Sequence, residues 1–204
     1  MTTPLRSGPD IDWRGKCHPG DYQGETGACA VFAIANWVEC MLGTPISDAA
    51  ALNVWREERM FRHHNLAGGL QITEAFTAVM VRTSWLPPTT TLRRVSNLET
   101  LPLAPLVVGF EDVDWALKPG TTLLSRNAPF THHAALAVSD IKGEVWVENS
   151  YGPKWGENGF ARMTHGFFSG HAEQIWQIIL PGASVTLDEA ARKYAAELAS
   201  SKGE

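Results

Sequence analysis

The chain has 204 residues, of which 44% are hydrophobic and 19% are charged. This composition suits one globular domain with a sizeable core. The formal net charge is -5, which argues against a nucleic-acid partner or an anionic membrane surface. No apolar run approaches the ~18 residues that a membrane span needs, so we expect a protein that acts on peptides or small molecules.

The start of the chain and its cysteines bear on the compartment. Residues 1–9 are polar and lack a basic region followed by an apolar run, so no secretory signal is predicted. Three cysteines, Cys17, Cys29 and Cys40, are too few and odd in number for a disulfide framework, which fits a reducing compartment. We expect a cytoplasmic protein, or one delivered from the cytoplasm by a specialised secretion system.

The first half of the chain is predicted to be helical after an irregular start. Residues 1–11 are expected to be disordered or extended, and a polar stretch rich in Gly and Pro continues to residue 28. Apolar residues then recur at helical spacing until Gly43 and Pro45 end the first pattern, and Ser47 can cap the next helix. The predicted helices are Cys29–Leu42, Ser47 to about Phe61, and Thr73–Thr83.

Beyond Pro87-Pro88 the pattern changes to short runs rich in β-branched and aromatic residues. The predicted strands are Leu92–Val95, Leu106–Phe110, Ala134–Ser139, Val145–Asn149, Phe160–Met163 and Ile175–Leu180. Helices first and strands later indicate an α+β fold with two packed lobes. Residues 184–204, which open with a capping box from Thr186 to Glu189, are predicted to form a C-terminal helix and tail.

Cys29 is the candidate nucleophile. It lies in the first turn of a predicted helix, where the helix dipole and unpaired backbone N–H groups favour the thiolate and lower the thiol pKa. A buried structural cysteine is the other interpretation, and it is the one that we give to Cys40, near the end of the same helix. Cys17, in a loop, is read in the same way, and no partner is suggested for it.

The string D-Y-Q-G-E-T-G-A-C-A-V-F-A at 21–33 resembles the active-site segment Q-G-x-C-G-S-C-W-A-F of papain-like cysteine peptidases (family C1). Gln23, six residues before Cys29, occupies the place of the family's oxyanion-hole glutamine. The resemblance implies that its amide and the Cys29 N–H donate to the oxyanion of a tetrahedral intermediate. The D-W-R at 12–14 also resembles the opening of the mature family domain.

The second half supplies the expected partners. T-H-H-A-A-L-A-V at 131–138 resembles the family's x-H-A-V strand, and E-N-S-Y-G-P-K-W-G-E-N-G-F at 148–160 resembles N-S-W-G-x-x-W-G-E-x-G-Y. These matches imply that His133 is the base and Asn149 the group that orients it. They also imply that Tyr151 and Trp155 shield the site from water.

Two further positions are expected to bind substrate. Gly68-Gly69, followed by Glu74 and Ala75, resembles the family's G-G-x-x-x-x-A segment, whose backbone pairs with an extended substrate. A simple helix-breaking Gly pair is the alternative. His132 points to the opposite strand face from His133 and is expected to tune the pH profile. No histidines have metal-like spacing, so neither a metal nor a cofactor is expected.

The resemblance implies a papain-like two-lobe fold over residues 12–183, with a helical lobe at about 25–86 and an antiparallel β lobe at about 88–182. Its central helix begins at the catalytic cysteine. Thr26 replaces a disulfide-forming cysteine of the family, Tyr151 replaces a Trp, and Ala30 replaces another Trp, which we expect to remove bulk beside the cleft. The chain is identified as a short divergent member without a propeptide.

The expected function is hydrolysis of peptide bonds in a protein or peptide substrate, through a Cys29 thioester. One expected role is a bacterial toxin or effector that cuts a specific protein and has a neutralising or inhibitory protein partner. A peptide transpeptidase, cyclase or processing peptidase in natural-product biosynthesis is an alternative. An inactive peptidase-like binding module is another. Neither nucleic acid nor membrane is an expected partner.

Overall fold

A computed structural model describes residues 10–18, 20–63, 68–117 and 121–182. The predicted C-terminal helix at 184–204 and most of the predicted N-terminal segment therefore lie outside the described residues. The elements are β1 (Ile11–Asp12), the 3-10 helix η1 (Arg14–Lys16), α1 (Cys29–Leu42), α2 (Asp48–His63), α3 (Ile72–Arg82), β2 (Thr91–Val95), β3 (Leu106–Val113), β4 (Asn127–Ile141), β5 (Glu144–Glu148), β6 (Phe160–Thr164), α4 (His165–His171) and β7 (Ala172–Ile179). None of the described helices is both long and apolar enough to cross a membrane.

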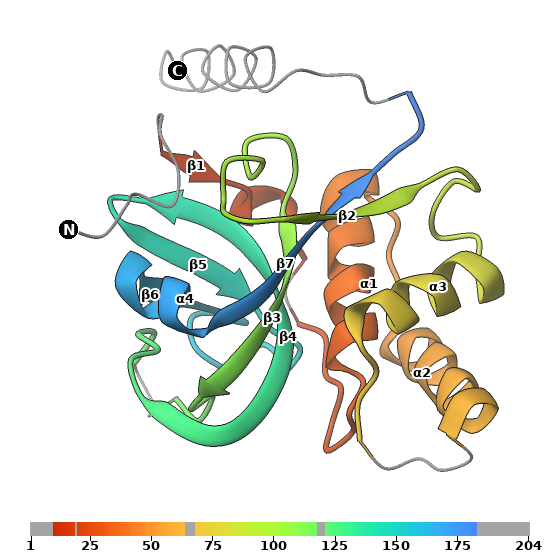
Figure 1. The fold of residues 1–204 in the computed structure, drawn as a ribbon, viewed down its shortest axis with the longest axis horizontal. Coiled ribbons are helices and arrows are strands. Elements are labelled where there is room, and N and C mark those ends of the chain that lie inside the picture. Colours follow the sequence, from red (N-terminus) through yellow and green to blue (C-terminus); the bar gives the residue numbers. More distant parts are fainter. Residues whose placement is uncertain (1–9, 19, 64–67, 118–120, 183–204) are drawn as a thin grey trace.

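The strands form one seven-stranded sheet in which every pairing is antiparallel. The order is β2-β7-β3-β4-β5-β6, and β1 pairs with β4. Figure 1 shows α1, α2 and α3 gathered beside this sheet, with α1 nearest to it. The predicted α+β architecture, a helical lobe followed by an antiparallel β lobe, is confirmed.

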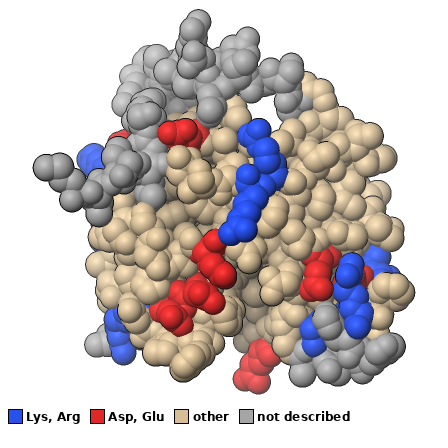
Figure 2. All heavy atoms as spheres, viewed as in Figure 1, with Lys and Arg blue, Asp and Glu red and all other residues tan. Residues whose placement is uncertain are grey.

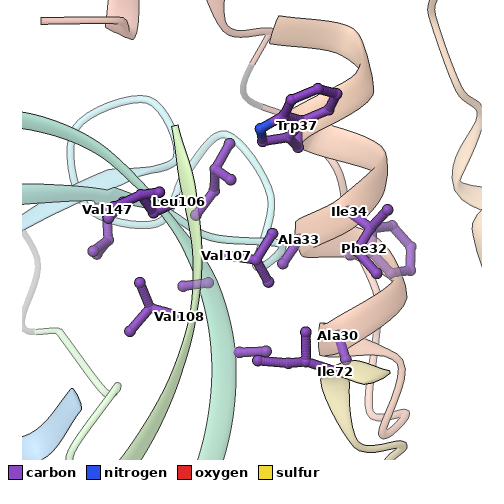
Figure 3. Close-up of a cluster of buried hydrophobic side chains, with 14 of the residues drawn as sticks. Ala30, Phe32, Ala33, Ile34, Trp37, Ile72, Leu106, Val107, Val108 and Val147 are labelled. Carbon is purple, nitrogen blue, oxygen red and sulfur yellow. The ribbon is translucent and has the colours of Figure 1, made fainter. Parts of the chain in front are cut away.

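Helix α1 is the centre of the core. All residues from Ala30 to Cys40 are buried, including the polar Asn36 and Glu39, as expected for the central helix of a core that is mostly apolar. Figure 3 shows Ala33 of α1 near Val107 of β3, while Phe32 and Ile34 project from the other side of the helix. The helix ends at Gly43, which adopts the left-handed conformation (φ 63°) that glycine tolerates. This packing fixes the axis of α1, and therefore the position of its first residue, Cys29.

Ala30 does not line the cleft. It is only 1% exposed, and in Figure 3 it lies beside Ile72 of α3. The expectation that Ala30 removes bulk beside the cleft is therefore wrong, because its side chain contributes to the core.

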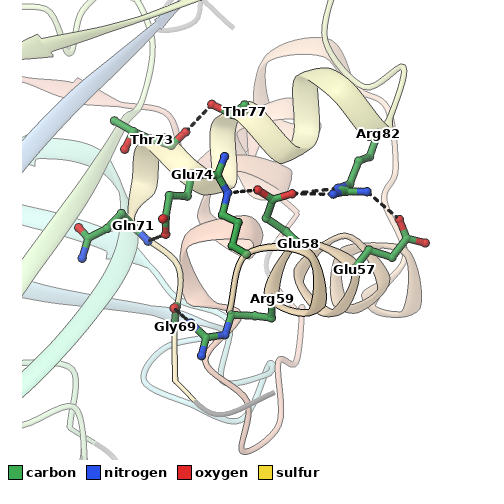
Figure 4. A network of polar contacts seen from close by, with 10 residues as sticks. Glu57, Glu58, Arg59, Gly69, Gln71, Thr73, Glu74, Thr77 and Arg82 are labelled. Carbon is green, nitrogen blue, oxygen red and sulfur yellow. Dashed lines mark hydrogen bonds and ion pairs between the residues drawn. The ribbon is translucent and has the colours of Figure 1, made fainter. Parts of the chain in front are cut away.

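The other two helices of this lobe begin at polar caps. The Ser47 hydroxyl accepts a hydrogen bond from Ala50 N at 3.2 Å, as predicted for the start of α2. A capping box of Gln71 and Glu74 begins α3. The carboxylate of Glu58 on α2 then joins the two helices, since it accepts hydrogen bonds from Arg62 and, at 2.8 and 3.0 Å, from Arg82 (Figure 4).

Three features of the β lobe differ from the sequence prediction. Strand β4 begins at Asn127, seven residues before the predicted Ala134. Strand β1 and helix α4 were not predicted at all. The Thr164 hydroxyl caps α4 by accepting from Phe167 N at 3.2 Å, and Phe168 is fully buried. Burial therefore stabilises a helix that its own two glycines disfavour.

Candidate active site

Cys29 is the first residue of α1 and is partly exposed, at the point where the helical lobe meets the sheet. The backbone N–H groups of Ala134, Ala30 and Cys29 itself act to lower the pKa of its thiol, and Cys29 lines one pocket with His133 and Ala134. Ala134 belongs to β4 and directly follows His133. The packing of α1 against β4 therefore places the thiol beside the predicted base.

His133 lies on β4, Asn149 directly follows the neighbouring strand β5, and the two side chains contact each other. The distance from His133 Nε2 to Asn149 Oδ1 is 2.7 Å, and both residues are buried. The same Oδ1 accepts a hydrogen bond from Ser150 N at 2.8 Å, which identifies it as the amide oxygen. Because an amide oxygen only accepts, His133 Nε2 must carry a hydrogen and Nδ1 is left as the basic nitrogen.

Aromatic rings enclose this histidine. The Trp115 ring centroid lies 4.5 Å from that of His133, and the Tyr151 centroid lies 5.1 Å away. Trp155, predicted to shield the site, contacts both rings and donates from Nε1 to Trp115 O at 2.9 Å. Sequence reasoning missed Trp115, because it stands in the loop after β3 and belongs to no recognised motif.

Gln23 is held in one orientation by its neighbours. Its Oε1 accepts a hydrogen bond from Ser150 Oγ at 2.5 Å, and its Nε2 donates to Thr26 O at 2.6 Å. Gln23 N also donates to Ser150 O at 3.0 Å. Since an amide nitrogen has two hydrogens, the second remains available to an oxyanion. Ser150, which sequence reasoning also missed, positions Gln23 while its neighbour Asn149 orients His133.

The pKa values of the reactive pair reflect burial. Burial raises the pKa of the Cys29 thiol, and the N–H groups of Ala134, Ala30 and Cys29 oppose this only in part. The prediction of a lowered pKa at the helix N-terminus is therefore wrong in its net direction. Burial lowers the pKa of His133 to about 4, although its hydrogen bond to Asn149 acts in the opposite direction and raises the pKa. Burial therefore acts against a charge on either group alone.

A pocket of about 290 Å³ opens beside Cys29 and His133. Its apolar wall comprises Leu70, Ile72, Phe110 and Ala134, and its polar lining comprises Gln71, His132, Glu173 and Gln174. At Gly109 an added Cβ would come within 3.3 Å of Ile72 Cδ1, so a larger residue there would narrow the pocket. The pocket can accept one side chain of a bound peptide.

The two glycines of the predicted substrate-binding segment lie close to the nucleophile. Gly69 lines the pocket, and Gly69 O accepts from Arg59 Nη1 at 3.0 Å. Gly27, two residues before Cys29, lies so close to this segment that an added Cβ would fall 2.3 Å from Gly68 O. The backbones of Gly27 and Gly68-Gly69 therefore meet where no side chain fits.

His132 faces solvent at the rim of the pocket, opposite in direction to the buried His133. Its Nδ1 lies 3.3 Å from Glu111 Oε1. Among the described residues, Glu111, His132 and Glu173 are the group with ligand atoms close enough to hold a metal ion, all within 4.8 Å of one another. The sequence did not predict this group, because its members come from three separate strands.

These elements together define the papain-like fold: a buried helix that begins at a cysteine, and an antiparallel lobe that presents a paired histidine and asparagine. No family model matches the sequence, and neither does any curated protein. Among solved structures, xylellain, a cysteine protease from Xylella fastidiosa, superposes with a TM-score of 0.68 at 18% identity, over 88% of this chain and 91% of xylellain.

Two further solved structures agree. The Carica candamarcensis cysteine protease CMS1MS2 has a TM-score of 0.62 at 19% identity, over 84% of this chain and 98% of that protein. A structure concerning the mite allergens Blo t 1 and Der p 1 has a TM-score of 0.58 at 21% identity, over 88% of this chain and 75% of that one. The likeness establishes the papain-like fold of this chain.

Proposed function

We propose that the protein is a cysteine peptidase that hydrolyses peptide bonds through a thioester on Cys29. The observation that carries the proposal is that Cys29, at the start of α1, lines one pocket with His133, a buried histidine that is hydrogen-bonded to Asn149. This arrangement supports the proposal, because nucleophilic catalysis needs a nucleophile near a base that a third group orients.

In the proposed reaction, His133 Nδ1 takes the proton of the Cys29 thiol as the sulfur attacks the substrate carbonyl carbon. Burial disfavours each charge alone, but proton transfer creates a thiolate and an imidazolium side by side, which attract each other. The second Nε2 hydrogen of Gln23 and the Cys29 N–H stabilise the oxyanion. His133 then protonates the leaving amine, and water hydrolyses the thioester with His133 as base.

A pair of adjacent histidine variants tests this assignment. His133→Ala should abolish cleavage of a fluorogenic peptide amide, because the substitution removes the proposed base. His132→Ala should retain turnover with a changed KM or pH profile, because His132 contributes to the lining of the pocket and is not the proposed base. Circular dichroism checks that both variants fold. Equal losses in the two variants would refute the role of His133.

Labelling of Cys29 separates an active enzyme from an inactive binding module. A peptidyl epoxide should add to Cys29, as shown by the mass of the Cys29 peptide, and should not label Cys29→Ala. The absence of both labelling and cleavage in folded protein would favour the inactive module. Product mass separates hydrolysis from transpeptidation, since hydrolysis adds one water to the products and transpeptidation joins two peptides.

The narrower proposal is a selective enzyme, such as a bacterial effector or toxin that cuts one protein target and is restrained by a neutralising protein. The small pocket with its polar rim supports selectivity, because it admits a limited set of side chains. New protein termini would be identified after incubating cell lysate with the active protein or with Cys29→Ala. A few cleaved proteins would support the proposal, and many unrelated ones would contradict it.

A further inference from the structure

The two cysteines outside the active site lie in contact with each other. Cys17 follows η1, Cys40 lies in the last turn of α1, and their Sγ atoms are 2.6 Å apart. Each residue is only 6% exposed. The sequence suggested no partner for Cys17, because these two cysteines are distant along the chain and meet only through the packing of the N-terminal segment on α1.

The surroundings of the pair restrict its chemistry. The Cys17 thiol donates to Trp13 O at 3.3 Å, and the carboxyl of Glu148, which is 1% exposed, lies nearby. The hydrogen bond with Cys40, burial and the Glu148 carboxyl all raise the pKa of Cys17. A thiolate, as nucleophile or metal ligand, is therefore disfavoured here. Two neutral thiols or a disulfide remain as the states that this site accommodates.

We propose that Cys17 and Cys40 form an intramolecular disulfide on reaction with a small disulfide oxidant such as oxidised glutathione. When local opening exposes one of the two cysteines to solvent, its thiol loses a proton and the sulfur attacks the oxidant, forming a mixed disulfide and releasing one glutathione thiol. The other cysteine sulfur then attacks the mixed disulfide at the protein sulfur and releases the second thiol. Two S–H bonds break, one protein S–S bond forms, and the oxidant takes up both electrons and both protons.

Competing pairs are excluded by the geometry of α1. Cys29 and Cys40 lie at opposite ends of this straight helix, eleven residues apart, and a rise of about 1.5 Å per residue separates them by roughly 16 Å. Disulfides need Cα atoms within about 7 Å. Cys17, which contacts Cys40, is accordingly remote from Cys29 as well. The disulfide leaves the proposed nucleophile free, while the ring it closes contains both Gln23 and Cys29.

The test uses full-length Cys29→Ala protein, in which Cys17 and Cys40 are the remaining thiols. The native protein is equilibrated with oxidised glutathione, quenched in acid, denatured and treated with N-ethylmaleimide. We expect no maleimide addition, a loss of two hydrogens in mass, and one peptide pair that joins the segments around Cys17 and Cys40. The melting temperature should rise by about 5–10 °C relative to the reduced protein.

Cys40→Ser in the same background is the matched control, and should carry one maleimide or one glutathione without gaining thermal stability. Wild-type protein whose Cys29 has been alkylated in the native state gives a second sample if Cys29→Ala folds poorly. Two maleimides, two bound glutathiones or a disulfide-linked dimer after oxidation would overturn the proposal. The readouts require no peptidase activity, so this inference and the proposed function can fail separately.

Discussion

Gly27→Ala probes whether the close approach of two backbones builds the substrate site. The added Cβ would lie 2.3 Å from Gly68 O, 2.4 Å from Gly68 C and 2.6 Å from Gly69 N. Ordinary contacts of this kind are no shorter than about 3.4 Å, so the Gly68-Gly69 backbone must retreat by about 1 Å. No flexible side chain is available to absorb the overlap.

The expected cost has two parts. Overpacking of this kind lowers the free energy of unfolding by about 1–3 kcal/mol. A misplacement of about 1 Å in a substrate-positioning segment lowers kcat/KM by on the order of 10²-fold. The alkylation rate of Cys29 by iodoacetamide should change little, because that small reagent does not need the Gly68-Gly69 backbone.

Urea unfolding, peptide-amide kinetics and the alkylation rate measure these three quantities. Gly15→Ala is the matched control, since nothing lies within 4 Å of its added Cβ, and it should change stability by less than about 0.5 kcal/mol. If Gly27→Ala keeps both its stability and its kcat/KM, the contact is not part of the substrate site. If alkylation slows as much as turnover, the substitution has disturbed Cys29 instead.

Three further predictions concern other parts of the molecule. Gln23→Ala should lower kcat by on the order of 10²–10³ as an oxyanion donor is lost, with Cys29 alkylation unaffected; a loss under tenfold would argue against that role. Burial and the neighbouring carboxylates raise the pKa of Asp21 to about 7 from 3.8, so folding favours its protonated form, and its contribution to stability is lost as pH rises through 7. The melting temperature of Asp21→Asn minus that of wild type should therefore increase between pH 5 and pH 8, and a constant difference would contradict the raised pKa. Glu58→Gln should lower the free energy of unfolding in urea by about 1–3 kcal/mol, because its buried carboxylate accepts hydrogen bonds from two arginines. Glu57→Gln removes a half-exposed ion pair and should lower it by less than about 1 kcal/mol. Equal losses of stability in the two variants would refute this distinction.

Helices were predictable from the sequence because their signals are local. The pattern of α1 and its Gly43 stop give its observed bounds, and Ser47 caps α2 as its side chain predicts. Helix α4 carries no such signal, since H-G-F-F-S-G-H has poor helix formers and depends on the burial of Phe168. The early part of β4 was missed because Pro129 and exposed polar residues look like a turn.

The candidate site was predictable only where a residue falls in a recognised motif. Cys29, Gln23, His133 and Asn149 were expected from such strings, and the structure brings them together at the junction of α1 and β4. The role of Trp115 and the Cys17–Cys40 contact depend on which parts of the chain lie side by side in space. The spacing of these residues along the chain does not predict these contacts.

The dipeptide Asn149-Ser150 links the formation of the candidate active site to the folding of the chain. Asn149 orients the base, Ser150 holds Gln23, and Gln23 lies in the segment that leads into α1. Gly152 N also donates to Asp21 O at 2.9 Å, so this bridge joins the sheet to the helical side of the molecule. In a chain whose two halves have not docked, His133 and Asn149 can still pair within the sheet, but Gln23 is not held beside Ser150. The proposed oxyanion donor would therefore form only when folding is complete, so the proposed reaction would be slow in incompletely folded copies.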